Sequence, residues 1–239
     1  MKPTIILLAL ISTIVTARSD LVIKQQNTIA QNKTSQSYTV TIKIRGDKIR
    51  TDTDGGLMAG TSFIIDANTY DSFTLEHKHK SVVKDSGEKE KQLQEKEKQS
   101  GNTNSVEGKL AKPLDTGKSE KVGAYDTEIY TWSGVNGGTA TFWVAKDFPN
   151  YERIKVAIDK LGQLAGLATL NAMFTLPGMV VKSQMILKRD VGETTSTATL
   201  ISVKEEPIDA STFEVPGDYT DITPPERHPR TNTVTTPNK

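Results

Sequence analysis

The stretch TATLISVKEEPIDASTFEVPGDYTDI, from Thr197 to Ile222, decides most about the fold of this chain. Its first part, residues 197–203, is rich in β-branched side chains, which is typical of a strand. Pro207 has no backbone N–H, so the strand pairing ends before it. The short apolar pair Phe213 and Val215 follows, ahead of a Pro-Gly turn. The stretch therefore predicts the last long strand of a sheet domain and the segment that closes it.

The same pattern recurs upstream. Residues 37–44, SYTVTIKI, alternate strictly between apolar and polar side chains, which indicates a half-buried antiparallel strand. Arg45-Gly46-Asp47-Lys48 supplies a hairpin turn after it. Similar patterns predict strands at about residues 21–29, 49–53, 61–65, 69–75, 121–133, 139–145, 179–190 and 195–206. Short strands at this spacing favour one curved antiparallel sheet.

One long helix is predicted at about Tyr151–Phe174. Its charged residues are confined to the first half, while the second half, LAGLATLNAMF, is apolar almost all round. A helix of this kind has to be buried against another element. We therefore expect an α+β fold in which a strongly curved antiparallel sheet, a half-barrel, has helices covering its concave face.

Three further segments complete the expected organisation. Residues 1–17 read as a secretory signal peptide, because Lys2 precedes an apolar run that is too short to span a bilayer. Residues 18–222 form one domain, in which the Lys/Glu-rich residues 84–117 are a polar insertion. That insertion is interpreted either as a flap or as a surface insertion with little to bury. Residues 223–239 are expected to be a disordered tail.

Composition limits the compartment and the chemistry. The chain has no cysteine, which excludes thiol catalysis, thiolate metal sites and a cysteine-linked lipid anchor. Cleavage of the signal peptide would remove one lysine from the 30 basic residues, which would then equal the 29 acidic residues in number. A balanced charge gives no attraction toward nucleic acid. We expect a periplasmic or secreted protein with no stable membrane insertion after cleavage.

Several pieces of the chain together resemble a known group of proteins. They are IKIRGDKIRTD (42–52), SFIIDANTYDSFTLEHKHK (62–80), VGAYDTEIYTW (122–132), FWVAKD (142–147), GMVVKSQMIL (178–187) and SVKEEPIDASTFEVPGDY (202–219). In order and spacing they resemble an exported bacterial family of unknown function, itself similar to the lipoprotein carriers LolA, LolB and LppX. The resemblance implies a half-barrel whose apolar cavity holds acyl chains. It implies no established activity.

The candidate ligand-binding residues are apolar. They are Leu161, Leu164, Leu167, Leu170, Met173 and Phe174 on the expected helix, with Phe142 and Trp143 on the sheet. Their alternative interpretation is ordinary core packing. The sequence predicts no catalytic residue, no metal site and no cofactor, because His77 and His79 lack further ligands nearby and no phosphate-binding glycine loop is found.

Three classes of function therefore remain open, of which the third is weaker than the other two. The first is a non-enzymatic binding protein with an apolar cavity for a lipid or acylated ligand. The second is an envelope interaction or sensor module with a filled core, which binds another protein. A third, weaker class is a hydrolase that uses turn carboxylates such as Asp52. The first class predicts that Leu167→Asp or Leu170→Asp removes the ligand while partly sparing the fold.

Overall fold

The computed structural model of this 239-residue chain describes residues 20–32, 34–88, 112–134, 138–152, 154–155, 175–189 and 192–224. The strands are β1 (Leu21–Gln31), β2 (Thr34–Arg45), β3 (Lys48–Asp54), β4 (Thr61–Asp66), β5 (Ser72–Glu76), β6 (Ser81–Asp85), β7 (Leu114–Val122), β8 (Tyr125–Ser133), β9 (Thr139–Ala145), β10 (Met179–Arg189), β11 (Gly192–Glu205) and β12 (Thr220–Asp221). Two short 3₁₀ helices accompany them, η1 (Gly56–Met58) and η3 (Ala210–Phe213).

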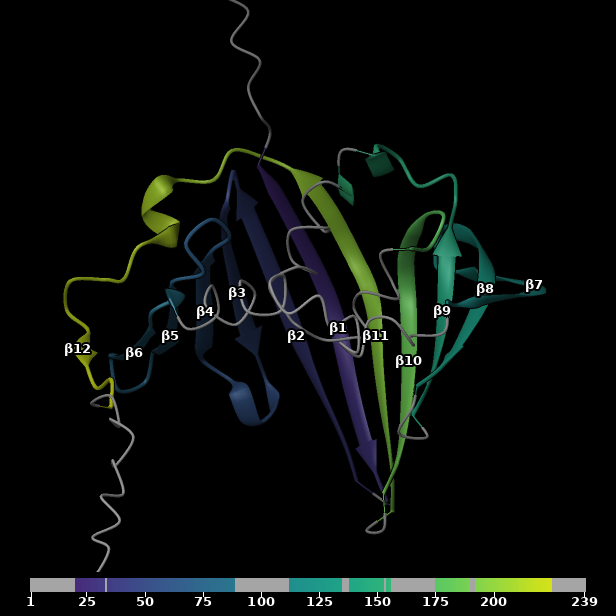
Figure 1. Ribbon diagram of the computed structural model, residues 1–239, viewed down its shortest axis with the longest axis horizontal. Coiled ribbons are helices and arrows are strands. Elements are labelled where there is room, and N and C mark those ends of the chain that lie inside the picture. The colour runs from purple at the N-terminus through teal and green to yellow at the C-terminus, as the bar shows by residue number, and fades with distance from the viewer. Residues whose placement is uncertain are drawn as a thin grey trace, which may run out of the picture.

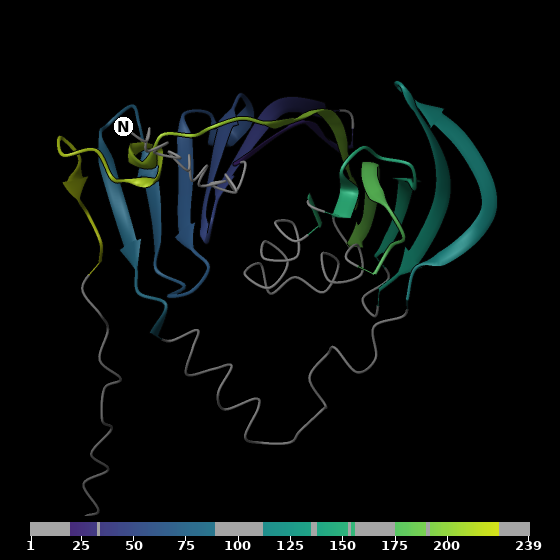
Figure 2. The same ribbon diagram turned by 90° about the horizontal axis from the view of Figure 1, so that it is seen from above.

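All twelve strands belong to one sheet (Figure 1), in the order β12-β6-β5-β4-β3-β2-β1-β11-β10-β9-β8-β7. The neighbours pair antiparallel except β12 and β6, which are parallel. The long strands β1, β2, β10 and β11 form the centre, and Figure 2 shows the sheet bent into an arch around them. Two register shifts, at β1–β11 and at β9–β10, lie in this region, and bulges of this kind bend strands.

The expected α+β class, with helices covering a concave face, is wrong for the described chain. The two 3₁₀ helices are short, and no described helix covers the concave face of the sheet (Figure 2). The expected helix at Tyr151–Phe174 lies largely outside the described residues; only residues 151–152 and 154–155 of it are described, and they are helical. The sheet can remain without such a layer because many of its positions carry Thr, Ser and Gln, which can hydrogen-bond to water. Thr28, Gln184 and Thr197 are half-buried examples.

The strand predictions are largely confirmed. β9 occupies the predicted residues, and the alternation in β2 places Tyr38, Val40, Ile42 and Ile44 opposite alternate residues of β1. Strand β7 is missed by the sequence pattern, because LDTGKSEKV has almost no apolar alternation and falls in part within the predicted polar insertion. It is the end strand of the described sheet, with a register shift between Asp115 and Ser119. Such positions tolerate charged sequences.

One face of the sheet carries most of the buried side chains of the central strands. Leu21, Ile23, Ile44, Ile49 and Ile65 lie opposite one another across β1 to β4 and belong to the largest buried cluster. On β9 and β10 the same cluster continues through Trp143, Ala145, Met179 and Val181. Phe148, which also belongs to this cluster, lines the cleft that is described below.

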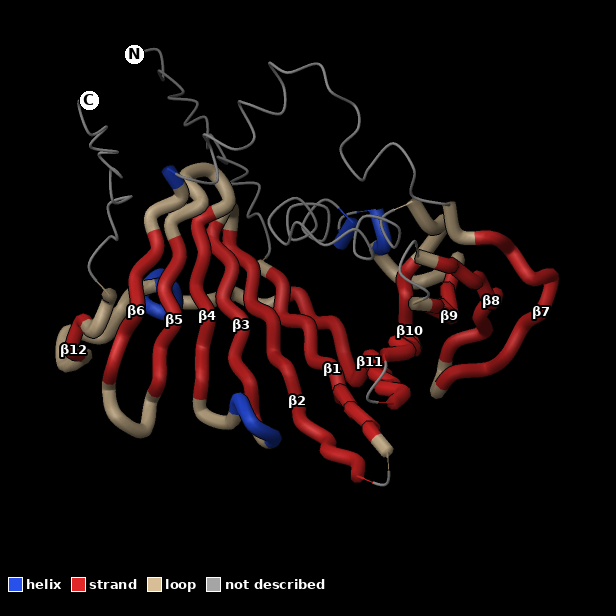
Figure 3. The backbone as a smooth tube through the Cα atoms, turned by 60° about the horizontal axis from the view of Figure 1, so that its bottom comes forward, coloured by secondary structure: helices blue, strands red, loops and turns tan. Residues whose placement is uncertain are grey.

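The opposite face, over β4 to β6, is covered by residues 206–221, which we call the C-terminal strap. Phe213 of η3 packs with Ile64, Leu75 and Val82 in a separate buried cluster, and η3 lies behind the sheet in Figure 3. The strap ends as β12 on the edge of β6, where the Thr220 N–H donates to the Lys80 carbonyl. The predicted tail thus begins only after a paired strand.

Other predictions lie outside the described residues. These are the signal peptide (1–17), most of the polar insertion, and the tail after Pro224. No helix among the described residues has the length and apolarity needed to cross a membrane.

Candidate functional site

The first part of the candidate site is a set of buried side chains that we call the aromatic cluster. It consists of Tyr130, Trp132, Ala140, Phe142, Val144 and Leu176, with Val180 packed against it. The β8–β9 register places Tyr130 opposite Phe142 and Trp132 opposite Ala140, so these four share one face of the hairpin. From Ala140 to Val144 the cluster runs about 13 Å along β9, at about 3.3 Å per residue.

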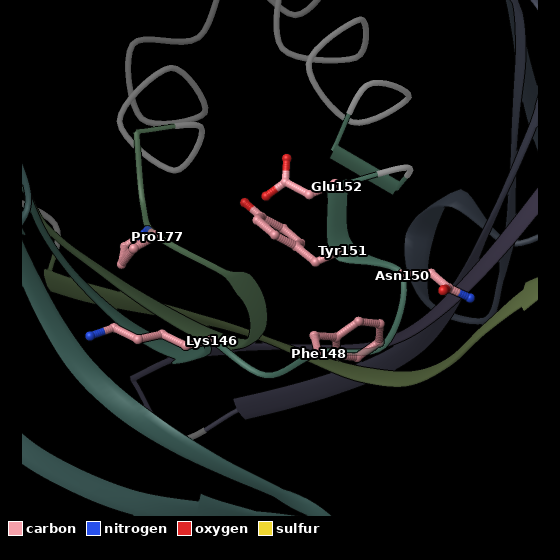
Figure 4. A pocket seen from close by; sticks show the side chains of 6 residues that line it. All are labelled: Lys146, Phe148, Asn150, Tyr151, Glu152 and Pro177. Atoms are coloured by element: carbon pink, nitrogen blue, oxygen red, sulfur yellow. The ribbon is translucent and has the colours of Figure 1, made fainter.

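The second part is an open cleft of about 430 Å³, whose described lining residues are Lys146, Phe148, Asn150, Tyr151, Glu152 and Pro177. Figure 4 shows Phe148 and Tyr151 standing between the sheet and the start of the helical turn. Phe148 is buried and its ring lies 5.0 Å from that of Tyr125, so the floor is rigid and aromatic. The charged side chains of Lys146 and Glu152 are exposed at the rim.

The two parts are joined near the C-terminal end of β9. Leu176 belongs to the aromatic cluster and its neighbour Pro177 lines the cleft, while the Tyr151 hydroxyl donates to the Leu176 carbonyl at 3.5 Å. The Tyr130 hydroxyl donates to Glu128 Oε2 at 3.0 Å, and the same oxygen accepts a 2.6 Å contact from Lys146 Nζ. A chain of contacts therefore leads from the cluster to the rim.

Protonation states at the rim follow from these contacts. Burial and the hydrogen bond to Glu128 raise the pKa of the Tyr130 phenol. The hydrogen bond to Glu128 also raises the pKa of the Lys146 ammonium. At neutral pH, Tyr130 is therefore a neutral donor and Lys146 a cation, and both are already directed at one carboxylate.

The two described residues of the predicted site point in opposite directions. Phe142 is in the aromatic cluster, whereas Trp143 points to the other face of β9, where its Nε1 donates to Glu120 Oε2 at 2.8 Å. The Lys182 ammonium lies 4.1 Å from the centre of the Trp143 ring. Leu161, Leu164, Leu167, Leu170, Met173 and Phe174 lie outside the described residues. The structure thus places Phe142 in the aromatic cluster, and Trp143 in the larger buried cluster that includes the cleft residue Phe148.

Trp132 is a residue that sequence reasoning missed. Its side chain is 7% exposed, and its Nε1 is a buried donor without a hydrogen-bond partner in the described structure. Leaving such a donor unpaired costs about 1–3 kcal/mol, so it calls for an explanation. The sequence contained a signal that could have identified Trp132. Residues two apart on a strand share a face, and the hairpin turn after Ser133 pairs Trp132 with Ala140.

A second polar group lies on the other face, beneath the strap. The Ser62 hydroxyl donates to Asp52 Oδ1 at 2.5 Å, and Arg50 donates to the same carboxylate atom and to Ser62 Oγ. His77 Nε2 lies 2.6 Å from Ser62 Oγ, and His77 Nδ1 lies 2.5 Å from the Tyr219 hydroxyl. Because the Ser62 hydrogen is used on Asp52, we assign the His77 proton to Nε2, with Tyr219 donating to Nδ1.

This group differs from a catalytic triad. In a triad the carboxylate orients the histidine, whereas here Asp52 bonds to Ser62, Arg50 and Lys43. Ser62 is also buried, at 2% exposed. Arg50 donates to the Thr212 carbonyl and His77 meets Tyr219, so the network fastens the strap to the sheet. The described residues contain no group of three or more acidic or histidine side chains that could hold a metal ion.

The network makes a testable prediction for pH dependence. Burial raises the pKa of Asp52, but hydrogen bonds from Lys43, Ser62 and Arg50 outweigh it and hold that pKa below its usual value. The ionised carboxylate therefore stabilises the folded protein above the unfolded-state pKa of about 3.9, and this stability is lost as pH falls through the lower, folded-state pKa. We expect Asp52→Asn to lower the free energy of unfolding by about 1.5–3 kcal/mol at neutral pH. The fall of that free energy at acid pH, measured by urea denaturation (the acid limb), should be less steep in the variant than in the wild type.

Asp54→Asn is the matched control, because Asp54 is exposed at the end of the same strand. It should leave both the neutral-pH stability and the acid limb unchanged. Identical acid limbs in Asp52→Asn and the wild type would contradict the role assigned to Asp52.

Comparison with known proteins places the chain in a family. A family model for a domain of unknown function, DUF4412, matches residues 22–219. The chain belongs to the DUF4412 family. The expected membership of a family of unknown function is thereby confirmed. No curated protein matches this DUF4412 chain.

Several solved structures match this chain to different degrees. An uncharacterized conserved protein from Thermus thermophilus matches with a TM-score of 0.50 and 5% identity, over 87% of this DUF4412 chain and 92% of that one. A domain described as an outer membrane lipoprotein-sorting protein, from Vibrio parahaemolyticus, matches at 0.33 and 10%, over 83% and 90%. A DUF1329 family protein from Desulfovibrio piger matches at 0.33 and 12%, over 84% and 91%. At 5% identity the likeness to the Thermus thermophilus protein concerns the fold alone.

Proposed function

We propose that this protein is a non-enzymatic binding protein of the periplasm or the extracellular space, which holds a lipid or other acylated ligand. The observation that carries the proposal is the continuity between the aromatic cluster and the cleft. A buried apolar cluster of about 13 Å along β9 adjoins, through the neighbouring residues Leu176 and Pro177, a cleft of about 430 Å³ with charges at its rim. Apolar walls with a few polar groups at the entrance are typical of ligand sites.

The proposal is supported by the arrangement of the charges. Lys146 is held by Glu128, and Asn150 donates to Glu205 at 3.2 Å, so both polar side chains are engaged away from the cleft floor. The floor is left to Phe148 and Tyr151, which offer apolar and aromatic surface. A hydrocarbon chain fits this environment better than a polar metabolite, because burying a polar group without a partner is costly.

A direct test is native mass spectrometry of the protein purified gently from the periplasm, followed by organic extraction. We expect a discrete adduct that extracts as a lipid. Tyr151→Asp should remove the adduct and weaken uptake of a fluorescent fatty acid at least about 10-fold, because it places a charge in the apolar cleft. Tyr151→Phe is the matched control, since it keeps the ring, and should retain both.

The second candidate is an interaction or sensor module with a filled core. It is favoured by the tight burial of the aromatic cluster, in which Phe142 is 1% exposed. This candidate predicts a clean apo mass and no uptake of the fluorescent fatty acid by the delipidated protein. That result would overturn the lipid-binding proposal.

A further inference from the structure

Trp132 is the only side chain of the described residues that keeps a buried nitrogen or oxygen without a hydrogen-bond partner. The other tryptophan of the same hairpin provides an internal comparison, because Trp143 Nε1 donates to Glu120. The indole of Trp132 has little freedom to turn toward another partner. A Cβ at Gly134 would lie 2.6 Å from its Cη2 atom, so the ring already packs closely on the chain.

From this geometry we infer that Trp132 Nε1 is the hydrogen-bond donor for the bound ligand, and that the ligand is an acyl ester or amide rather than a hydrocarbon or a free carboxylate. The inference rests on the proposed lipid-binding function and specifies its ligand. Nε1 is one donor among apolar neighbours: Ala140, Phe142, Val144 and Leu176 share its cluster. One neutral carbonyl oxygen satisfies one indole N–H.

The other polar group of the cluster does not serve this purpose. The Tyr130 hydroxyl already donates to Glu128 at 3.0 Å, and Glu128 also binds Lys146. A carboxylate ligand at Trp132 would therefore be a buried charge without a cation beside it in the cluster, which is unfavourable. An ester carbonyl needs one donor and no counter-charge, so it matches what Trp132 supplies.

The test compares two probes with the same number of heavy atoms, methyl dodecanoate and pentadecane, as competitors of a fluorescent fatty acid bound to the full-length mature protein. We expect the wild type to bind the ester about 10-fold more tightly than the alkane. Trp132→Phe keeps an apolar ring and should abolish this preference, so that the variant binds the ester and the alkane equally tightly. A preference that persists in Trp132→Phe, or is absent from the wild type, would overturn the inference.

A second measurement follows ligand binding on the wild type, and a variant is needed only to assign the resonances. In a ¹⁵N-labelled sample the two indole N–H groups give two resonances, assigned by Trp132→Phe or Trp143→Phe. Methyl dodecanoate should move the Trp132 resonance downfield, whereas Trp143 serves as the control because its N–H is already bonded.

Binding of both probes without a shift at Trp132, for example because a buried water satisfies its N–H, would refute the role of Trp132 while sparing the lipid-binding proposal. Failure of both probes to bind would refute both.

Discussion

Replacing Phe142 with alanine is expected to lower the free energy of unfolding by about 3–5 kcal/mol. Phe142 is 1% exposed and lies between Tyr130 of β8 and Ser183 of β10, at the centre of the aromatic cluster. Its removal both loses the transfer free energy of the ring and leaves a cavity that rigid neighbours cannot fill. Urea denaturation followed by far-UV circular dichroism measures the loss.

Phe63→Ala is the matched control. It makes the same substitution on the same type of element, but Phe63 of β4 is 41% exposed. We expect a loss within about 1 kcal/mol, because an exposed ring gains little on folding. Equal losses at both positions would mean that Phe142 is not packed as described.

Replacing Gly178 with alanine is expected to destabilise the protein by about 3 kcal/mol, at the upper end of the usual range for overpacking. Gly178 precedes β10 where that strand pairs with the end of β9. An added Cβ would lie 2.5 Å from the Ala145 carbonyl oxygen and 2.9 Å from Lys146 Cα. These are backbone atoms, so relief requires the ends of β9 and β10 to move apart. The thermal unfolding midpoint should fall accordingly.

Gly217→Ala separates this steric effect from the general effect of glycine replacement. A Cβ at Gly217 has nothing within 4 Å, so the substitution should be neutral or slightly stabilising. Gly178 directly follows Pro177, which lines the cleft. Gly178→Ala should therefore also weaken fatty-acid uptake, by an amount that depends on how far it displaces the residues around the cleft. A Gly178→Ala variant as stable as the wild type would contradict the close approach of the two strands.

Alternation along the chain was enough to find most of the sheet. Residues 37–44 and 139–145 repeat every two positions because successive side chains of a strand point to opposite faces, and both segments are strands. The same logic failed for β7, whose residues are mostly charged or small. An end strand buries little, so its pairing leaves no apolar pattern to detect.

The candidate site was predictable only in part. The apolar character of Phe142 was visible, but the decision between its face and that of Trp143 depends on which neighbours each face meets. Trp132 could have been paired with Ala140 from the hairpin alone, but its unpartnered Nε1 depends on how the surrounding strands fill the space. Burial is a property of the assembled sheet and not of any segment.

By itself, the sequence determined most of the strands, the hairpin turn at residues 45–48, the absence of thiol chemistry and the position at which the last long strand ends. These features follow from local rules: the period of two, the missing donor of proline and the residue inventory. Tertiary structure alone decided that β1 pairs with β11, that the strap returns to the edge of β6, and that Asp52 meets His77 through Ser62. These contacts join residues far apart in the chain, and their partners are chosen by packing and hydrogen-bond satisfaction over the whole sheet.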